Sequence, residues 1–277
     1  MYRGRLLKSV LLIAVSAVCV TAAVILFARN GNNGGTRAAL SINETPGGNA
    51  NGYYYDFVLD TQNRGNVNCY MVKYKPNDYE AAYNYALRFI DIAEYYEDDR
   101  AYIFYGSDGE VTIDKSINQI HYDNYSSAVN NEPISGDQAA IDIAQAFFRE
   151  RMFQLFYEEA QVYRDDARYQ ILFVSRLSNL KNYAFANRLE MDMRGNIISA
   201  DYFTVQSDKV GDCKTLSMAE AFDLLPPLSL DNEETVRLQN CQLVYIYDES
   251  IIQPAYYFQG LATEDRTFEC YVKAAVF

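Results

Sequence analysis

Several residue types on which enzymes commonly depend are scarce or absent in this chain. Tryptophan is absent, and His121 is the only histidine among 277 residues. A single histidine excludes the H-E-x-x-H zinc site and clusters of histidine ligands, and it leaves one candidate for a Ser–His pair. His121 lies between Ile120 and Tyr122 in an alternating pattern. That pattern predicts a hydrogen-bonded or exposed strand residue instead of a catalytic base.

The glycine and lysine motifs of nucleotide-binding and hydrolytic enzymes are also missing. No G-x-S-x-G elbow, P-loop or G-x-G-x-x-G pattern occurs. Ser178 and Lys181 have the S-x-x-K spacing of penicillin-binding enzymes, but no K-T-G accompanies them and they fall in a predicted hairpin loop. The acidic clusters lack the ligand spacing of a calcium loop. We therefore predict that the protein is not an enzyme, with no catalytic residues, no cofactor and no metal site.

Acidic residues are absent from the first 40 residues and abundant afterwards. The chain has 37 Asp and Glu against 24 Lys and Arg, for a net charge of -13. Such an excess of negative charge repels nucleic acid, so we expect no nucleic-acid partner.

A long apolar run occurs at one place, near the N-terminus. Residues 9 to 28 carry no charged side chain and would span about 30 Å as a helix, the thickness of a membrane core. Arg3, Arg5 and Lys8 precede this run, which predicts a cytoplasmic N-terminus. A cleaved signal peptide, or a lipoprotein signal at Cys19, is the alternative. The length of the run and the lack of a clear A-x-A site favour a retained single-pass anchor.

The N-terminal part thus divides into a cytoplasmic tail (residues 1–8), a transmembrane helix (residues 9–28) and a flexible linker (residues 29–52). The linker is rich in Gly and Asn and cannot bury enough apolar surface to fold. Everything beyond it is predicted to lie outside the cell, tethered to the cell membrane. Small residues on one face of the transmembrane helix predict a seam for a partner helix. The candidate seam residues are Val10, Ala14, Ala17 and Thr21.

The region after residue 52 predicts an α+β fold in which a helix followed by antiparallel strands recurs. We place an N-terminal α+β unit at residues 53–130, with a helix over about residues 77–96. Its predicted apolar face is Tyr79, Tyr83, Leu87, Ile90 and Ala93. The C-terminal part, residues 131–277, predicts two further units of one helix and a strand meander.

Two helix starts in the C-terminal part carry N-cap signals. Ser135 and Gln138, and later Ser217 and Glu220, have the spacing of a capping box. Pro226 is expected to end the second of these helices.

Tyrosine is abundant, with 25 residues. Neighbouring pairs such as Tyr95 and Tyr96 suggest a stacking platform, but adjacent strand residues point to opposite faces of a sheet. We therefore interpret most tyrosines as core and sheet-face residues.

Four cysteines follow the apolar run, and an even number outside the cell permits two disulfides with three connectivities. Buried free thiols are the alternative. The candidate disulfide cysteines are Cys69, Cys213, Cys241 and Cys270.

The C-terminal strands resemble those of a known group of proteins. Residues 241–245 (CQLVY), 253–258 (QPAYYF) and 271–274 (YVKA) are similar to the closing strands of the YycI/YycH membrane-anchored regulators of the WalK sensor kinase. Tyr256 stands where that family often has Trp, and Lys273 where it has Asn. The family's Gly after the last strand is missing as well. These positions are strand signals and carry no catalytic group.

The first helix of the C-terminal part resembles a second kind of module. Residues 140–146, 169–173 and 191–198 are similar to a PepSY-type arrangement of a helix followed by strands around a Gly turn.

Together the resemblances imply a single-pass, extracytoplasmic regulator that modulates a two-component sensor histidine kinase through protein–protein contacts. The implied partner is the kinase, or a sister single-pass regulator, at the membrane. One alternative is an extracytoplasmic binding module for cell-wall glycan or peptide on a Tyr-lined face. The other is a PepSY-like protease-inhibitor domain.

Overall fold

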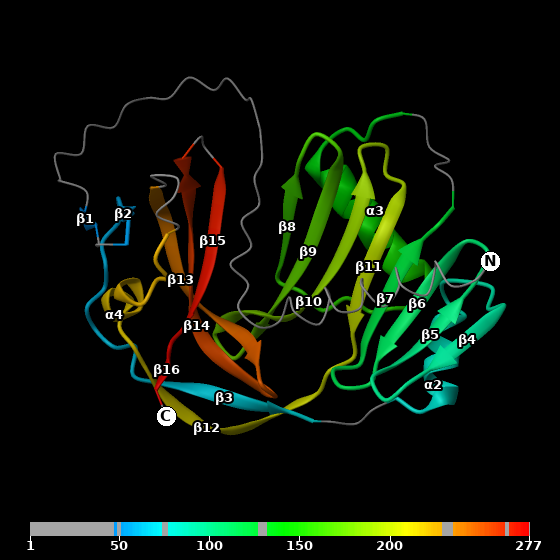
Figure 1. Ribbon diagram of the computed structural model, residues 1–277, viewed down its shortest axis with the longest axis horizontal. Coiled ribbons are helices and arrows are strands. Elements are labelled where there is room, and N and C mark those ends of the chain that lie inside the picture. Colours follow the sequence, from blue (N-terminus) through cyan, green and yellow to red (C-terminus); the bar gives the residue numbers. More distant parts are fainter. Residues whose placement is uncertain are drawn as a thin grey trace. The chain divides into compact units, whose positions relative to one another are not determined.

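A computed structural model describes residues 47–48, 51–73, 77–126, 132–228, 235–263 and 266–276, which form mainly β strands (Figure 1). The predicted α+β class with repeated helix-plus-strand units is therefore wrong. The described ranges contain three helices. They are α2 (Tyr79–Ala86), α3 (Asp137–Glu150) and α4 (Met218–Asp223).

The chain separates into two compact units. The first unit combines Met1–Tyr70 with Val210–Phe277, and the second unit is Met71–Lys209. The boundary expected between residues 130 and 131 falls inside the second unit.

One antiparallel sheet organises the second unit. Its strand order is β4-β5-β6-β7-β11-β10-β9-β8. On each side of the central β7–β11 pair, the strands follow one another outward in reverse chain order. The strands are β4 (Glu94–Glu97), β5 (Ala101–Tyr105), β6 (Gly109–Asp114), β7 (Gln119–Asn124), β8 (Glu159–Arg164), β9 (Arg168–Leu177), β10 (Leu180–Asp192) and β11 (Ile197–Phe203).

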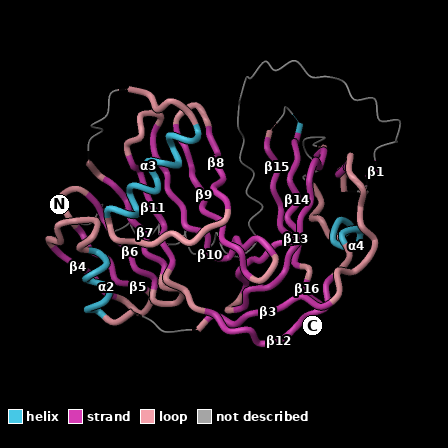
Figure 2. Tube along the Cα trace, turned by 180° about the vertical axis from the view of Figure 1, so that it is seen from behind, coloured by secondary structure: helices cyan, strands magenta, loops and turns pink. Residues whose placement is uncertain are grey.

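Both α2 and α3 lie on the same face of this sheet, as Figure 2 shows from behind. Each helix faces the sheet with two fully buried alanines, Ala82 and Ala86 in α2 and Ala140 and Ala144 in α3. Alanine has no long side chain, so the helix backbones can approach the strands closely. The same face of each helix continues into aromatic residues that complete the core.

The apolar face predicted for the first helix was right only in part. Ile90 is buried in the core and Tyr83 packs against it. Tyr79 and Leu87 are 40% and 48% exposed, and Ala93 is exposed as well. The helix also ends at Ala86, ten residues earlier than expected, because residues 94–97 pair with β5 as strand β4. Adjacent tyrosines favour a strand over a helix.

The two predicted capping boxes had different outcomes. Ser217 accepts a hydrogen bond from the backbone N–H of Glu220 while the Glu220 carboxylate accepts from the Ser217 N–H, so this box is confirmed. The N-cap of α3 is Gly136, with φ of 133° and no side-chain cap, so the box expected at Ser135 was wrong.

The first unit is built on a second antiparallel arrangement, with β14 between β13 and β15. Strand β2 adds to β13 in parallel, and Phe222 of α4 and Tyr53 help to cover the core. The strands are β1 (Gly47–Gly48), β2 (Tyr53–Tyr55), β3 (Asn66–Val72), β12 (Ser207–Thr215), β13 (Val236–Asp248), β14 (Ile251–Ala262), β15 (Thr267–Lys273) and β16 (Ala275–Val276). Strands β3 and β12 each continue into the second unit.

The predicted membrane anchor needs a correction. Within the described ranges, no helix is long and apolar enough to cross a membrane. The predicted span at residues 9–28 lies outside the described residues, as do its seam residues Val10, Ala14, Ala17 and Thr21. We therefore withdraw the single-pass anchoring, the membrane location and the sensor-kinase or sister-regulator partnership at the membrane.

Candidate binding face

The two faces of the second-unit sheet have opposite chemistry. On the helix side, directly paired residues form a lateral row of apolar side chains across all eight strands. We call it the core row, and its six central members are buried. In strand order it is Tyr95, Phe104, Val111, Tyr122, Ala200, Leu189, Ile171 and Val162.

The opposite face, which none of the described helices covers and which we call the helix-free face, carries a row of very different composition. We call it the acidic row. Four of its eight members are carboxylates, two are tyrosines, and all are at least partly exposed. At about 4.8 Å between strands, the row is about 34 Å wide. In strand order it is Glu94, Tyr105, Glu110, Asp123, Ser199, Glu190, Gln170 and Tyr163.

Next to the acidic row, an ion-pair cluster lies where β7 meets β11. His121 pairs directly with Asp201, and its Nδ1 is 2.7 Å from the Asp201 Oδ1. The His121 Nε2 lies 3.2 Å from Asp123 Oδ2. Arg188 Nε lies 3.3 Å from the second Asp201 oxygen, and the Gln119 amide donates to Asp201 over 2.6 Å. The side chain of Asp201 is only 10% exposed, so this cluster is anchored by a buried carboxylate.

Electrostatics keep the cluster charged. Burial alone would lower the pKa of His121, but hydrogen bonds to Asp123 and Asp201 outweigh it and raise the pKa to about 10. Burial alone would raise the pKa of Asp201, but the bond to His121 and the charges of His121 and Arg188 hold it below its ordinary value. A protonated imidazole held by two carboxylates cannot accept a proton near neutral pH. The expectation of a hydrogen-bonded strand histidine is confirmed.

Tyrosines gather at the β4 end of the acidic row. Tyr96 and Tyr125 are 55% and 59% exposed, and the Tyr125 hydroxyl donates to Glu110 over 3.0 Å. Tyr105 lies between Glu94 and Glu110 in the row. Burial, followed by the charges of Glu110 and Glu94, raises the pKa of Tyr105, so its hydroxyl stays neutral. This end of the face therefore presents aromatic rings beside carboxylates.

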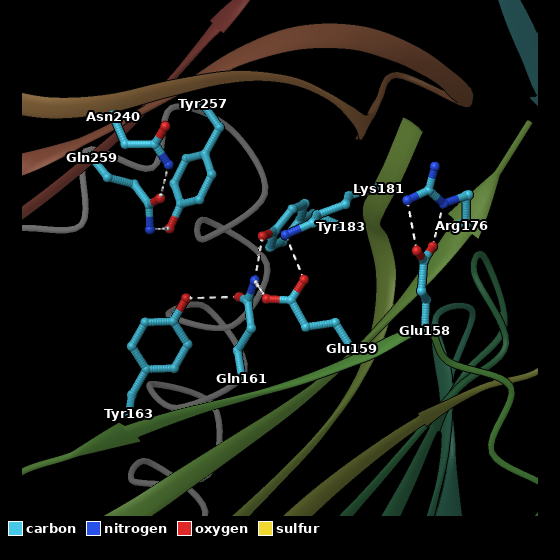
Figure 3. Close-up of polar contacts among 10 residues, drawn as sticks. All are labelled: Glu158, Glu159, Gln161, Tyr163, Arg176, Lys181, Tyr183, Asn240, Tyr257 and Gln259. Atoms are coloured by element: carbon cyan, nitrogen blue, oxygen red, sulfur yellow. Dashed lines mark hydrogen bonds and ion pairs between the residues drawn. The ribbon is translucent and has the colours of Figure 1, made fainter. Parts of the chain in front are cut away.

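The β8 end has a different polar network (Figure 3). Gln161 donates to the Tyr183 hydroxyl over 2.7 Å and accepts from the Tyr163 hydroxyl over 3.1 Å. Lys181 pairs with Glu159 at 2.5 Å. These charges neutralise each other, so the β8 end is polar without being strongly acidic.

Opposite charges also pair at the β9–β10 turn, where the Arg176 guanidinium bonds Glu158 (Figure 3). Ser178 lies in this turn with φ of 54°. The hairpin loop expected for the S-x-x-K tetrapeptide is confirmed, and Lys181 is in an ion pair instead of facing a nucleophile.

The first unit has its own polar ladder on β13 and β14. The Asn240 side chain donates to the side-chain oxygen Oε1 of Gln259 over 3.1 Å, and the Gln259 amide donates to the Tyr257 hydroxyl over 3.1 Å (Figure 3). Tyr257 stacks on Tyr271 with ring centroids 4.5 Å apart. This ladder orders side chains on one face of the first unit.

The four candidate disulfide cysteines separate into two pairs with different states. Cys69 and Cys213 form a disulfide that joins β3 to β12. Cys241 and Cys270 are free thiols, and burial raises their pKa to about 12 and about 11. Both pair with Phe258 from opposite sides. Two strand spacings, about 10 Å, separate them, too far for a disulfide.

Sequence reasoning missed the acidic row. Its members are each one residue away from a core-row residue, so the strand alternation was visible, but the lateral alignment of eight strands was not. In the part of the chain that the structure describes, no group of three or more His, Cys, Asp or Glu could hold a metal ion.

No protein-family model matches this chain. No curated protein matches it either. Among solved structures, it is similar to an uncharacterized protein from Eubacterium rectale, with a TM-score of 0.45 and 10% identity over 81% of this chain and 87% of the other. It is also similar to the Bacillus megaterium YpeB C-terminal domain, with a TM-score of 0.40 and 15% identity over 73% of this chain and 95% of that domain.

At these TM-scores the likenesses are weak. The PepSY part of the expected resemblance has a weak counterpart in the YpeB domain, which is PepSY-related. No family match supports the YycI/YycH part.

Proposed function

We propose that this chain is a non-catalytic binding module that recognises a basic segment of a partner protein on the acidic row. The observation that carries the proposal is the row itself, with four carboxylates aligned across one sheet face. Asp123 and Glu190 already have cationic partners in His121 and Arg168, so Glu94 and Glu110 carry the recognition. A regulatory role through protein–protein contacts would be exerted through this face.

The β4 end is the proposed centre of recognition. In the described structure no Lys or Arg lies within ion-pair distance of Glu94 or Glu110. Tyr96 and Tyr105 flank these carboxylates with aromatic rings. Lys and Arg side chains bind such surroundings well, because the carboxylate attracts the charge and the ring face attracts the cation and its apolar stem. A neutral glycan would use the rings but leave the carboxylates without counter-charge.

The ion-pair cluster supports this role without taking part in it. His121 and Asp201 hold β7 and β11 together in a fixed register, so the carboxylates on either side keep their spacing. A preorganised surface reduces the ordering cost of binding. Catalysis is not part of the proposal, since the protonated His121 cannot serve as a base.

The test is the affinity of the full chain for a lysine decapeptide, measured by calorimetry at low salt. The variant Glu94→Gln/Glu110→Gln should bind about three- to tenfold more weakly, because each exposed charge pair contributes up to about 1 kcal/mol. The matched control is Glu80→Gln/Asp142→Asn, which removes the same charge from exposed helix positions.

An equal loss in the control would reduce the binding to attraction by net charge, and unchanged affinity in the face variant would contradict the proposal. Tight binding of a neutral cell-wall glycan, weakened by Tyr96→Ala but not by Glu110→Gln, would favour the glycan alternative instead.

A further inference from the structure

A groove opens on the helix side of the second unit, away from the acidic row. It has a volume of about 530 Å³, within the range of ligand sites. The carboxyl ends of α2 and α3 form it, and two of its six lining residues are arginines. The lining residues are Asn84, Leu87, Arg88, Glu150, Arg151 and Met152.

Arg151 is half-buried, and no carboxylate of the described residues lies within ion-pair distance of it. Its guanidinium lies 3.7 Å from the centre of the Phe147 ring, and its Nε atom is buried with no hydrogen-bond partner. One N–H donates to the Phe147 carbonyl oxygen over 3.3 Å. Burial lowers the pKa of Arg151, yet the side chain remains a cation at any physiological pH.

Arg88, two residues after the end of α2, also lines the groove and makes the same kinds of contact. It lies 4.9 Å from the centre of the Phe153 ring and donates to the Met152 carbonyl oxygen over 3.2 Å. Within the described ranges, no carboxylate lies at ion-pair distance from Arg88 or Arg151, although Glu150 also lines the groove. The chain has 37 Asp and Glu against 24 Lys and Arg, so two neighbouring arginines without a carboxylate partner are unexpected.

Capping of helix ends explains only part of this arrangement. Each guanidinium uses one of its five donors on a carbonyl oxygen, so most donors remain available. Met152 adopts a left-handed conformation, with φ of 58°, and is 75% exposed. A non-glycine residue in that region costs about 1 kcal/mol or more, and such strain concentrates at binding sites.

We infer that the groove between the carboxyl ends of α2 and α3 binds a small ligand through its oxyanion, a phosphate or a carboxylate. Arg88 and Arg151 supply planar forks that match two oxygens of such a group. Leu87 and Met152 supply apolar walls for the rest of the ligand. The site is independent of the proposed basic-segment recognition on the acidic row.

The experiment uses the full chain with sodium phosphate as the probe and sodium chloride at equal ionic strength as the reference. Arginine Nε–Hε signals are followed by NMR during titration. We expect a saturable shift of the Arg151 signal with phosphate only. Arg151→Gln and Arg88→Gln should each weaken phosphate binding about tenfold or more, since a charge-assisted hydrogen bond is lost.

Arg164→Gln is the matched control, because Arg164 also lies over an aromatic ring, that of Tyr169, but outside the groove. It should bind phosphate as the wild type does. If Arg151→Gln fails to fold, Arg151→Lys keeps the charge over the Phe147 ring and should still weaken binding by loss of the fork.

Absence of a saturable shift, or an equal loss in Arg164→Gln, would overturn the inference. Sodium acetate distinguishes the two sources of the oxyanion. Acetate that displaces phosphate extends the site to carboxylates, and acetate that does not restricts it to phosphate.

Discussion

The two faces of the second-unit sheet come from the same strands yet obey different constraints. Phe104 and Tyr105, Val111 and Glu110 are neighbours in sequence, and each pair sends one side chain to either face. The helix side is fixed by burial, since it must cover an apolar core. On the opposite side Ile103 and Val174 are buried, but every member of the acidic row is at least partly exposed, so the row is less constrained by the core. A shift of one residue in register would exchange the two faces.

The largest difference between the two faces is expected when a side chain of the core row is truncated. Phe104 is fully buried and contacts aromatic rings of α2 and β4. Phe104→Ala should lower the free energy of unfolding by about 4 kcal/mol, because it removes apolar contacts and leaves a cavity. Urea unfolding monitored by circular dichroism measures it.

The matched substitution on the other face is Glu110→Ala, one strand away. It should change the free energy of unfolding by no more than about 0.5 kcal/mol, as for most surface positions. Similar costs for the two substitutions would mean that the faces are not separated as described.

The difference between the faces also explains how much of the fold the sequence could predict. The strand around His121 was expected, because Ile120 and Tyr122 alternate with polar residues and both are buried. Helix α2 was misjudged because the large residues Tyr79 and Leu87 suggested a face, whereas the small alanines of the helix are the residues that pack on the sheet. Close packing on a sheet rewards small residues that no periodicity of large residues reveals.

A smaller loss of stability is expected from the ion-pair cluster, which lies on the helix-free face where β7 meets β11. Asp201→Asn keeps the shape of the side chain but removes the charge that His121 and Arg188 share. We expect a loss of about 2 kcal/mol at neutral pH, less than for a fully buried pair, because the His121 side chain is 37% exposed. Urea unfolding at pH 7 measures it.

Glu110→Gln is the control for loss of charge on the same face and should stay within about 0.5 kcal/mol of the wild type. In a double-mutant cycle, His121→Gln should cost less in the Asp201→Asn background than alone. Additive costs would show that the two residues do not interact.

Only part of the ion-pair cluster could be predicted from the sequence. Alternation around His121 predicted a strand position with a hydrogen-bond partner. The partners could not be predicted, because Asp201 and Arg188 are 80 and 67 residues away and are brought together only by the β7–β11 and β10–β11 pairings. The acidic row escaped prediction for the same reason, since a lateral row exists only after eight strands are in register.

The smallest expected effect is on pH dependence, and it tests whether the cluster is electrostatically coupled or merely polar. The folded-state pKa of His121, about 10, lies above its value of 6.5 in an unfolded chain. The protonated imidazole therefore stabilises the folded state fully below about pH 6.5, and this contribution is lost as the pH rises towards 10.

His121 is the only histidine, so its ring signals in an NMR titration are unambiguous. We expect no titration between pH 5 and pH 8 in the folded protein. Loss of one carboxylate partner in Asp123→Asn should move the midpoint down towards the ordinary value, because Asp201 alone then opposes the effect of burial. A midpoint near 6.5 in the wild type would mean that neither Asp123 nor Asp201 holds the proton on His121.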